Sequence, residues 1–197
     1  MTKTLNKKDL FWIFVRSNFL LGSFNFERMQ AMGFCVSLIP ALKKLYQGDE
    51  LKAALKRHLE FFNTQPFLGA AIMGIIAAME EKRANGADIS QQTLSGVKVG
   101  LIGPLAGVGD PIFWGTLRPV LAALGAGIAL TGSILGPIIF FVAFNALRLL
   151  THWYGVMYGY SKGTELVEGI GGNKMRYLTE GSSVLGLLVM GALVAKW

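Results

Sequence analysis

The stretch GPLAGVGDPIFWGTLRP, residues 103–119, lies in the most apolar part of the chain and is rich in glycine and proline. It holds one acid, Asp110, and one base, Arg118. Proline removes a backbone donor and disrupts a helix interior. A charged side chain in an apolar membrane segment costs at least about 2.5–3.5 kcal/mol. We therefore expect the backbone to break here and Asp110 to face a cavity, a partner or a substrate.

The composition around this stretch is that of a membrane protein. Of the 197 residues, 52% are hydrophobic and 16% are charged, against roughly 25% charged in a soluble domain. The mean hydropathy is +0.47. Residues 1–60 hold ten of the nineteen lysines and arginines, whereas residues 99–147 hold one. A basic region that borders an apolar one indicates a cytoplasmic N-terminus and a multi-pass membrane protein, and not a nucleic-acid binder.

The N-terminal part reads as short helices that do not cross the membrane. Residues 9–21, DLFWIFVRSNFLL, predict an interfacial helix, with a buried soluble helix as the alternative. The segment 25–46 contains Pro40 and predicts a kinked or membrane-inserted helix. Asp49 begins an amphipathic helix whose leucines recur at helical spacing.

The rest of the chain predicts membrane helices separated by breaks. The apolar run 66–79 is followed by a polar loop that starts at Glu80. Residues 119–150 would form a helix of about 48 Å, so we expect two helices, broken near Gly136-Pro137, across a hydrocarbon core of about 30 Å. A polar loop over 161–181 and an apolar run over 182–195 complete the pattern.

Glycine pairs four residues apart recur in these apolar segments and would allow helices to approach closely. They are Gly96–Gly100, Gly103–Gly107, Gly132–Gly136 and Gly155–Gly159. The predicted fold is all-α: a polytopic membrane protein with broken helices, re-entrant hairpins and interfacial amphipathic helices.

Asp110 and Trp114 are candidate substrate-binding residues. Asp-Pro suits the N-cap and first position of a helix, so Asp110 acts as a cap alone or as a cap that also contacts substrate. Trp114 follows one helical turn later and would cover the apolar face of a sugar ring, or else it marks the membrane interface. We expect Arg118 to pair with an acid or to lie at an interface.

Asn63, Thr64 and Gln65 form the second candidate group, directly before Pro66. The residue before proline avoids helical geometry, so the backbone is expected to open here. Donors and acceptors between apolar segments suit a neutral polyol, and the alternative is loop capping.

Other chemistry has little support. His58 and His152 are too far apart in sequence to indicate a metal site, and the single cysteine, Cys35, fits core packing. The chain has no phosphate-binding loop and no hydrolase or metalloprotease motif. We expect no metal, no cofactor and no catalytic residue, and an independent membrane enzyme is disfavoured.

Four long stretches resemble one known family. They are NFERMQAMGFCVSLIPALKKLY (25–46), KRHLEFFNTQPF (56–67), GVKVGLIGPLAGVGDPIFWGTLRPVLAALGAGIA (96–129) and YGYSKG (158–163). They are similar to the enzyme IID component of the mannose family of the bacterial sugar phosphotransferase system. The resemblance runs from about Lys8 to Trp197.

The resemblance implies a plasma-membrane subunit that pairs with enzyme IIC, in a trimer of IIC–IID pairs within the bilayer. The pair would translocate a mannose- or glucose-type hexose, which a cytoplasmic IIAB component phosphorylates. Some family members also serve as bacteriocin receptors. A scaffold and bacteriocin-docking subunit, whose IIC partner makes the sugar contacts, is the alternative function.

We expect one membrane domain over 1–197, with an interfacial and amphipathic arm at about 1–62 and a membrane core at about 63–197. Family members continue past the position of Trp197 with a periplasmic segment and further apolar helices. We therefore expect this chain to lack the C-terminal segment of the family.

Overall fold

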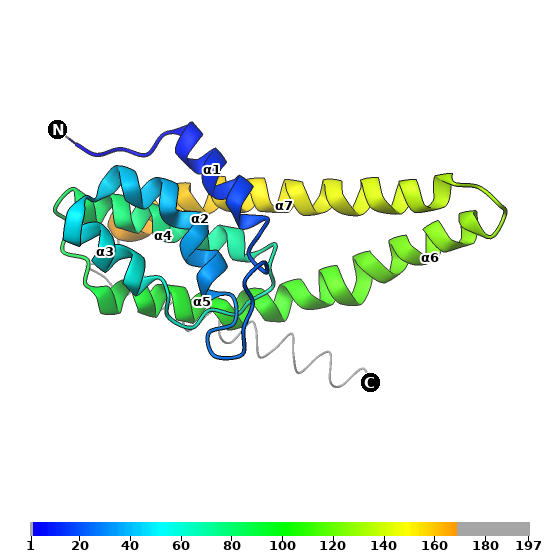
Figure 1. Ribbon diagram of the computed structural model, residues 1–197, viewed down its shortest axis with the longest axis horizontal. Coiled ribbons are helices and arrows are strands. Elements are labelled where there is room, and N and C mark those ends of the chain that lie inside the picture. Colours follow the sequence, from blue (N-terminus) through cyan, green and yellow to red (C-terminus); the bar gives the residue numbers. More distant parts are fainter. Residues whose placement is uncertain (1, 169–197) are drawn as a thin grey trace.

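A computed structural model describes residues 2–168, and every regular element in this range is a helix (Figure 1). This confirms the all-α prediction. The elements are α1 (Lys7–Ser17), α2 (Ala31–Leu45), α3 (Gly48–Arg57), α4 (Gly69–Ala84), α5 (Gln91–Ile112), the π-helix η1 (Phe113–Leu117), α6 (Arg118–Ala129) and α7 (Leu135–Glu168). The predicted apolar run 182–195 lies outside the described residues.

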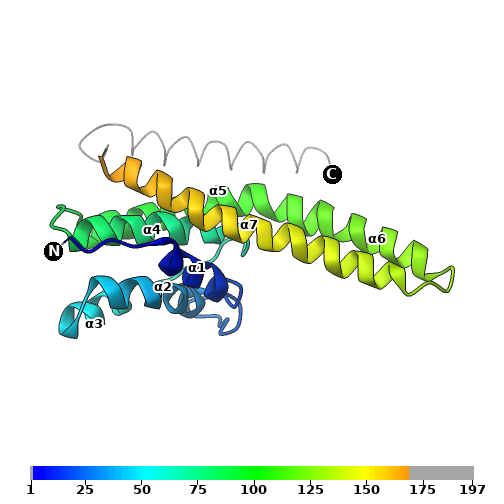
Figure 2. The ribbon, with the colours of Figure 1, turned by 90° about the horizontal axis from the view of Figure 1, so that it is seen from above.

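The helices form a body and an arm. The body contains α1–α4, the first part of α5 and the last part of α7, and the arm is the antiparallel pair of α6 with the first part of α7 (Figures 1 and 2). In Figure 2, α1, α2 and α3 lie on one side of α4 and α7. The arm extends away from the body without further helices among the described residues.

Capping and side-chain polarity define α1. The Asn6 side chain accepts hydrogen bonds from the backbone N–H groups of Lys8 and Asp9, at 3.0 and 3.1 Å, and Asp9 accepts from the Asn6 N–H at 2.8 Å. This reciprocal capping box fixes the helix start. Leu10 and Ile13 are buried against the body, whereas neighbouring aromatic side chains are exposed. The helix predicted over residues 9–21 is thus present but ends at Ser17, and its position at the membrane interface stays a prediction.

Pro40 is accommodated inside α2 by a side chain from α1. Proline has no N–H to donate to the carbonyl four residues earlier, which here belongs to Val36. Arg16 Nη1 donates to that carbonyl oxygen at 3.2 Å. Most of α2 is buried against protein, and its 15 residues span only about 22 Å.

Small residues allow α4 and α7 to pack closely, and nearly the whole of α4 is buried. A Cβ added at Gly159 would collide with the carbonyl oxygen of Ala71, and one at Gly163 would lie 2.8 Å from the Ala78 Cβ. Of the predicted glycine pairs, Gly155–Gly159 therefore lies in a helix contact.

Helix α4 continues through Glu80 to Ala84. The polar loop therefore begins five residues later than predicted.

The prediction that the backbone opens at residues 103–119 is wrong, because the segment is a helix with one irregular turn. The chain stays helical from Gln91 to Ala129, with Pro104 and Pro111 inside α5. The irregularity is η1, after which the Arg118 N–H donates to the Phe113 carbonyl five residues back. The ring of a proline inside a helix clashes with the carbonyl four residues earlier. A wider π turn accommodates this clash without opening the backbone. Asp110 consequently lies within a helix and is not an N-cap.

The arm turns between α6 and α7, as predicted, a few residues before Gly136-Pro137. Gly132 takes a φ of 83° in the turn, a conformation that glycine adopts readily. Gly125 and Gly136 then face each other, since a Cβ at Gly125 would lie 2.9 Å from the Gly136 carbonyl oxygen. The predicted polar loop over 161–181 is wrong up to residue 168, because α7 continues to Glu168; the remainder lies outside the described residues.

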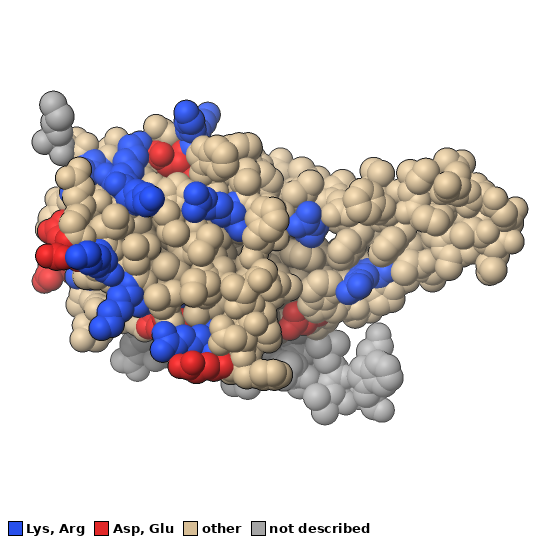
Figure 3. All heavy atoms as spheres, viewed as in Figure 1, with Lys and Arg blue, Asp and Glu red and all other residues tan. Residues whose placement is uncertain are grey.

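Within residues 2–168, two helical segments are long and apolar enough to cross a membrane, Gln91–Ala129 with 39 residues and Leu135–Gly163 with 29 residues. They correspond to about 58 and 43 Å of helix. Residues 119–147 contain no Asp, Glu, Lys or Arg. Figure 3 accordingly shows charged side chains over the body and an arm that is almost free of them.

Candidate functional site

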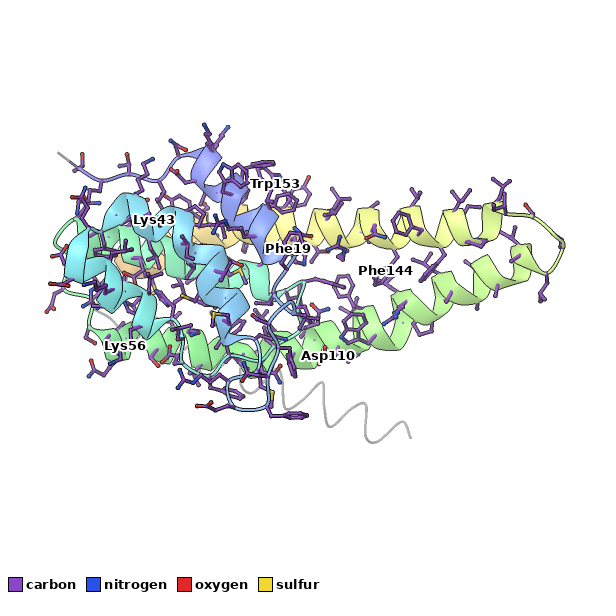
Figure 4. The ribbon with its side chains drawn as sticks, in the orientation of Figure 1. Phe19, Lys43, Lys56, Asp110, Phe144 and Trp153 are labelled. Carbon is purple, nitrogen blue, oxygen red and sulfur yellow. The ribbon has the colours of Figure 1, made fainter. Side chains whose placement is uncertain are left out.

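The candidate site lies where the α3–α4 link meets the end of α5. Thr64 and Gln65 in this link are 5% and 0% exposed, whereas Asn63 is exposed. Asp110 lies near the point where the lower helix leaves the body (Figure 4). The predicted open backbone over the polar triplet is confirmed, because no helix covers residues 58–68.

Thr64 is held by the surrounding structure on three sides. Its backbone carbonyl accepts a hydrogen bond from Gln30 Nε2 at 2.8 Å, and its N–H donates to Gln30 Oε1 at 3.2 Å. Its hydroxyl donates to the Ile102 carbonyl on α5 at 2.8 Å. These bonds use the polar groups of Thr64, so its observed role is to fix the link against α2 and α5. The sequence analysis missed Gln30.

The Gln65 side chain caps the turn before the N-terminus of α4, and its amide Nε2 is left without a partner within residues 2–168. Its Oε1 accepts from the N–H groups of Phe67 and Leu68, at 2.8 and 2.9 Å. Its Nε2 is buried and has no hydrogen-bond partner among the described residues. An unpaired buried donor costs about 1–3 kcal/mol. Gln65 is therefore a buried side chain of this region that keeps an unpaired donor in the described part of the chain.

Gly109 brings Gln65 next to Asp110. A Cβ at Gly109 would lie 2.7 and 2.8 Å from Gln65 side-chain carbons, so only glycine permits this approach. Asp110, the next residue, is exposed. Trp114 follows one turn later and is 36% exposed. The structure thus places Gln65, Asp110 and Trp114 in one region. The exposed side chain of Asn63 makes no hydrogen bond within the described part of the chain.

Phe67 joins this region to the arm, a role that sequence reasoning missed. Its ring lies 5.3 Å from the Trp114 ring, 4.8 Å from Phe113 and 6.0 Å from Phe144 on α7, measured between ring centroids. Such edge-to-face and tilted contacts add stability beyond burial. An aromatic residue directly after the polar triplet and Pro66 was the available indication.

Arg118 lies over the Trp114 ring, with its guanidinium carbon 5.4 Å from the ring centroid. Arg118 makes this cation–π contact in place of the expected ion pair, which is absent among the described residues, and its position at a membrane interface stays a prediction. The described residues contain no group of three or more His, Cys, Asp or Glu that could hold a metal. His152 is buried, and its Nδ1 lies 2.9 Å from the Ser17 hydroxyl.

A separate buried polar cluster surrounds Glu80 in the body. Its carboxylate accepts from the Tyr46 hydroxyl at 2.6 Å, Arg57 Nε at 2.8 Å and His58 Nε2 at 2.8 Å. Burial alone would raise the pKa of Glu80, but these partners outweigh it and hold that pKa below its ordinary value. Burial lowers the pKa of His58 despite the nearby carboxylate. The neutral ring therefore donates to Glu80, and His58 is a core residue.

Comparison with known proteins identifies the family. The model of the mannose/fructose/sorbose family IID component of the sugar phosphotransferase system matches residues 4–197. The chain is 60% identical over 197 residues to the mannose-specific EIID component of Escherichia coli K12, covering 99% of this chain and 70% of that protein. It is 61% identical over 196 residues to the fructose permease IID component of Bacillus subtilis, covering 99% and 71%.

Solved structures agree with the sequence relatives. A cryo-electron microscopy structure of the mannose transporter ManYZ with microcin E492 matches with a TM-score of 0.93 and 60% identity, over 99% of this chain and 72% of that chain. The chain is also 56% identical over 197 residues to a sorbose-specific EIID component of Klebsiella pneumoniae, covering 99% of this chain and 72% of that protein. The chain belongs to the IID component family of the mannose/fructose/sorbose phosphotransferase systems, as a transport subunit of a membrane permease complex and not as a catalytic enzyme.

Proposed function

We propose that this chain, paired with an enzyme IIC subunit, binds and translocates a mannose- or glucose-type hexose that a cytoplasmic IIAB component phosphorylates. The chain acts in the bacterial plasma membrane as a multi-pass subunit with a cytoplasmic N-terminus, in a trimer of IIC–IID pairs. Its family membership and its two long apolar helices support this assignment. Relatives of similar identity are named for mannose, fructose and sorbose, so the proposal specifies a hexose as the substrate class.

The unpartnered amide of Gln65 is the observation that carries the proposal. Gln65 Nε2 is buried and lacks a partner among the described residues, and the Cβ and Cγ of the same side chain lie against Gly109, the residue before the exposed Asp110. Hydroxyl groups of a sugar both donate and accept. Gln65 Nε2 would donate to one hydroxyl, and Asp110 would accept from another.

Trp114 would provide the apolar platform for the sugar ring. Trp114 is 36% exposed, and its indole is contacted by Phe67 and Arg118. Thr64 would act by fixing the link that carries Gln65, and Asn63 would contribute from its exposed position. Because Asp110 and Trp114 lie on an open surface, the IIC subunit would supply the opposite wall of the site.

A scaffold and bacteriocin-docking subunit is the second candidate. The open surface at Asp110 and Trp114 favours it, because both side chains could contact protein in place of sugar. The structural relative that contains microcin E492 also supports a docking role. In this case the IIC partner would make the sugar contacts.

Substitution in the full-length complex separates the two candidates. We expect Asp110→Asn and Trp114→Ala each to reduce hexose uptake and binding about tenfold, because the first removes the charge that strengthens a hydrogen bond to the sugar and the second removes the apolar platform. Asp88→Asn and Trp12→Ala are matched controls, since both side chains are exposed and lie outside the site. Unchanged uptake and binding in both site variants, at equal protein levels, would remove these residues from the sugar site and favour the scaffold.

A further inference from the structure

A hollow in the body, away from the Gln65–Asp110 region, gathers basic side chains. Its volume is about 300 Å³, and it lies between the N-terminal segment, the end of α2, α3 and the end of α4. Its lining residues are Lys3, Tyr46, Glu50, Ala53, Arg57, Arg83 and Ala84. Three bases and one acid thus face a space large enough for a small anion.

Arg83 is the least satisfied of the three bases. Its Nη1 is buried and has no hydrogen-bond partner within residues 2–168. A buried charged donor without a partner costs more than a neutral one. Because the Arg83 side chain also lines the hollow, an acceptor bound there would lie close to this incompletely paired guanidinium.

Lys3 and Arg57 are held in place beside it. Lys3 Nζ donates to the Leu45 carbonyl at 2.6 Å, which leaves two of its three N–H donors for other partners. Lys3 Nζ and the Arg57 guanidinium carbon lie 5.9 and 5.6 Å from the centroid of the Tyr46 ring. The ring therefore helps to position both cations before any ligand arrives.

The acids near the hollow do not neutralise it. Glu80 pairs with Arg57 at 2.8 Å and is 0% exposed, so its charge is already satisfied by that guanidinium and two further donors. Glu50 is exposed and forms no ion pair with Lys3 or Arg83 in the described part of the chain. Lys3 and Arg83 thus have no ion-pair partner among the described residues, and the three bases of the lining outnumber its one acid.

We propose that Lys3, Arg57 and Arg83 form a binding site for a phosphate group, supplied by an anionic phospholipid headgroup or by free inorganic phosphate. Guanidinium and ammonium donors match the several acceptor oxygens of phosphate. The hollow lies at the end of the body opposite the arm, where charged side chains gather (Figures 1 and 3). Basic pockets at the ends of membrane helices are suited to such headgroups. This site is independent of the proposed hexose site.

The test uses the purified membrane complex and two phosphate sources. Native mass spectrometry would measure retention of phosphatidylglycerol, with diacylglycerol as the lipid that lacks phosphate. Isothermal titration at constant ionic strength would measure inorganic phosphate. The test variant is Lys3→Gln combined with Arg83→Gln. Lys52→Gln is the matched control, because Lys52 lies on α3, is largely exposed and pairs with Asp49 away from the hollow.

We expect the double variant to weaken phosphate-group binding at least fivefold while the control changes nothing, because each base near a headgroup contributes to its attraction. Loss confined to phosphatidylglycerol assigns the site to a lipid, and loss confined to inorganic phosphate assigns it to the free ion. Absence of binding to the parent complex would overturn the proposal, as would equal binding by the double and control variants. Thermal midpoints measured without ligand show that both variants are folded.

Discussion

At the scale of the residue, Glu80 organises the centre of the body. It is fully buried and accepts from Tyr46, Arg57 and His58, which come from the end of α2 and from the end of α3 and its cap. Burial of a carboxylate is tolerated only when partners of this kind satisfy it. The cluster therefore fixes α3 and the end of α2 against α4.

The stability of the body is expected to fall with acidification because of His58. Burial lowers its pKa from an ordinary value of 6.5, so below that pH the unfolded chain binds a proton that the folded chain excludes. Glu80, whose folded pKa is also lowered, adds a further loss as the pH falls below 4.5. Thermal midpoints of the complex should thus decrease from pH 7 to pH 5.

His58→Gln is the variant that tests this origin. A glutamine amide can still donate to Glu80 but does not titrate, so the decrease between pH 7 and pH 5 should become shallower. An identical slope in the variant and the parent would show that other groups cause the pH dependence. The exposed substitution Lys52→Gln provides a control of similar size.

Residue types in the sequence predicted candidate site residues but not the contacts that those residues make. Gln65, Asp110 and Trp114 share one region, but this depends on the close approach of Gly109 to Gln65. Such a contact between distant segments has no local pattern in sequence. Thr64 is used for structural hydrogen bonds, which is the loop-capping alternative.

At the scale of the element, the packing of α4 on α7 depends on glycine. Backbone atoms of one helix occupy the places where side chains would begin on the other, at Gly74 and Gly159. Small residues at such contacts are a common means of helix association in membranes. The predicted pairs that contain Gly96 and Gly103 differ, because no described atom beyond the local helix backbone lies within 4 Å of a Cβ at either residue, whereas Gly136 packs against Gly125 within the arm.

Gly159→Ala should destabilise the complex, whereas Gly103→Ala should not. The added methyl at residue 159 meets the Ala71 carbonyl oxygen, and overpacking of this kind costs about 1–3 kcal/mol. Both changes replace a helical glycine by alanine, so the gain in helix propensity is shared. Thermal midpoints in detergent measure the difference. Equal midpoints for the two variants would show that α4 and α7 can separate without cost.

The path of α5, η1 and α6 shows that proline spacing alone does not predict the backbone geometry. Proline spacing predicted a break at residues 103–119, and the structure contains an irregularity at Phe113–Leu117. Sequence alone did not distinguish an open backbone from a π turn, because each can accommodate a proline, which has no backbone N–H to donate. Packing of Phe67 against Phe113 and Trp114 favours the helical solution.

At the scale of the whole molecule, the charge distribution divides the chain into a polar body and an apolar arm. The two candidate spans are antiparallel and meet at the turn 130–134. The loop 85–90 lies at the other end of the first span, and Asn85 there bonds to Lys3 of the N-terminal segment. The N-terminus and this loop therefore share one side of the molecule.

We expect cysteines at Asp88 and Ser133 to be accessible from opposite sides of the membrane. The intervening helix of about 58 Å exceeds the hydrocarbon thickness of about 30 Å. In a Cys35→Ser background, an impermeant thiol reagent applied to intact cells should label Ser133→Cys, whereas Asp88→Cys should react only after lysis. Labelling of both from the same side would show that the arm is a re-entrant hairpin.

A structure of the full complex with bound hexose tests the central proposal most directly. We predict sugar density within hydrogen-bonding distance of Gln65 or Asp110 and against the Trp114 ring. Sugar enclosed entirely by residues of the partner subunit, with no contact to residues 63–65 or 110–114, would contradict it.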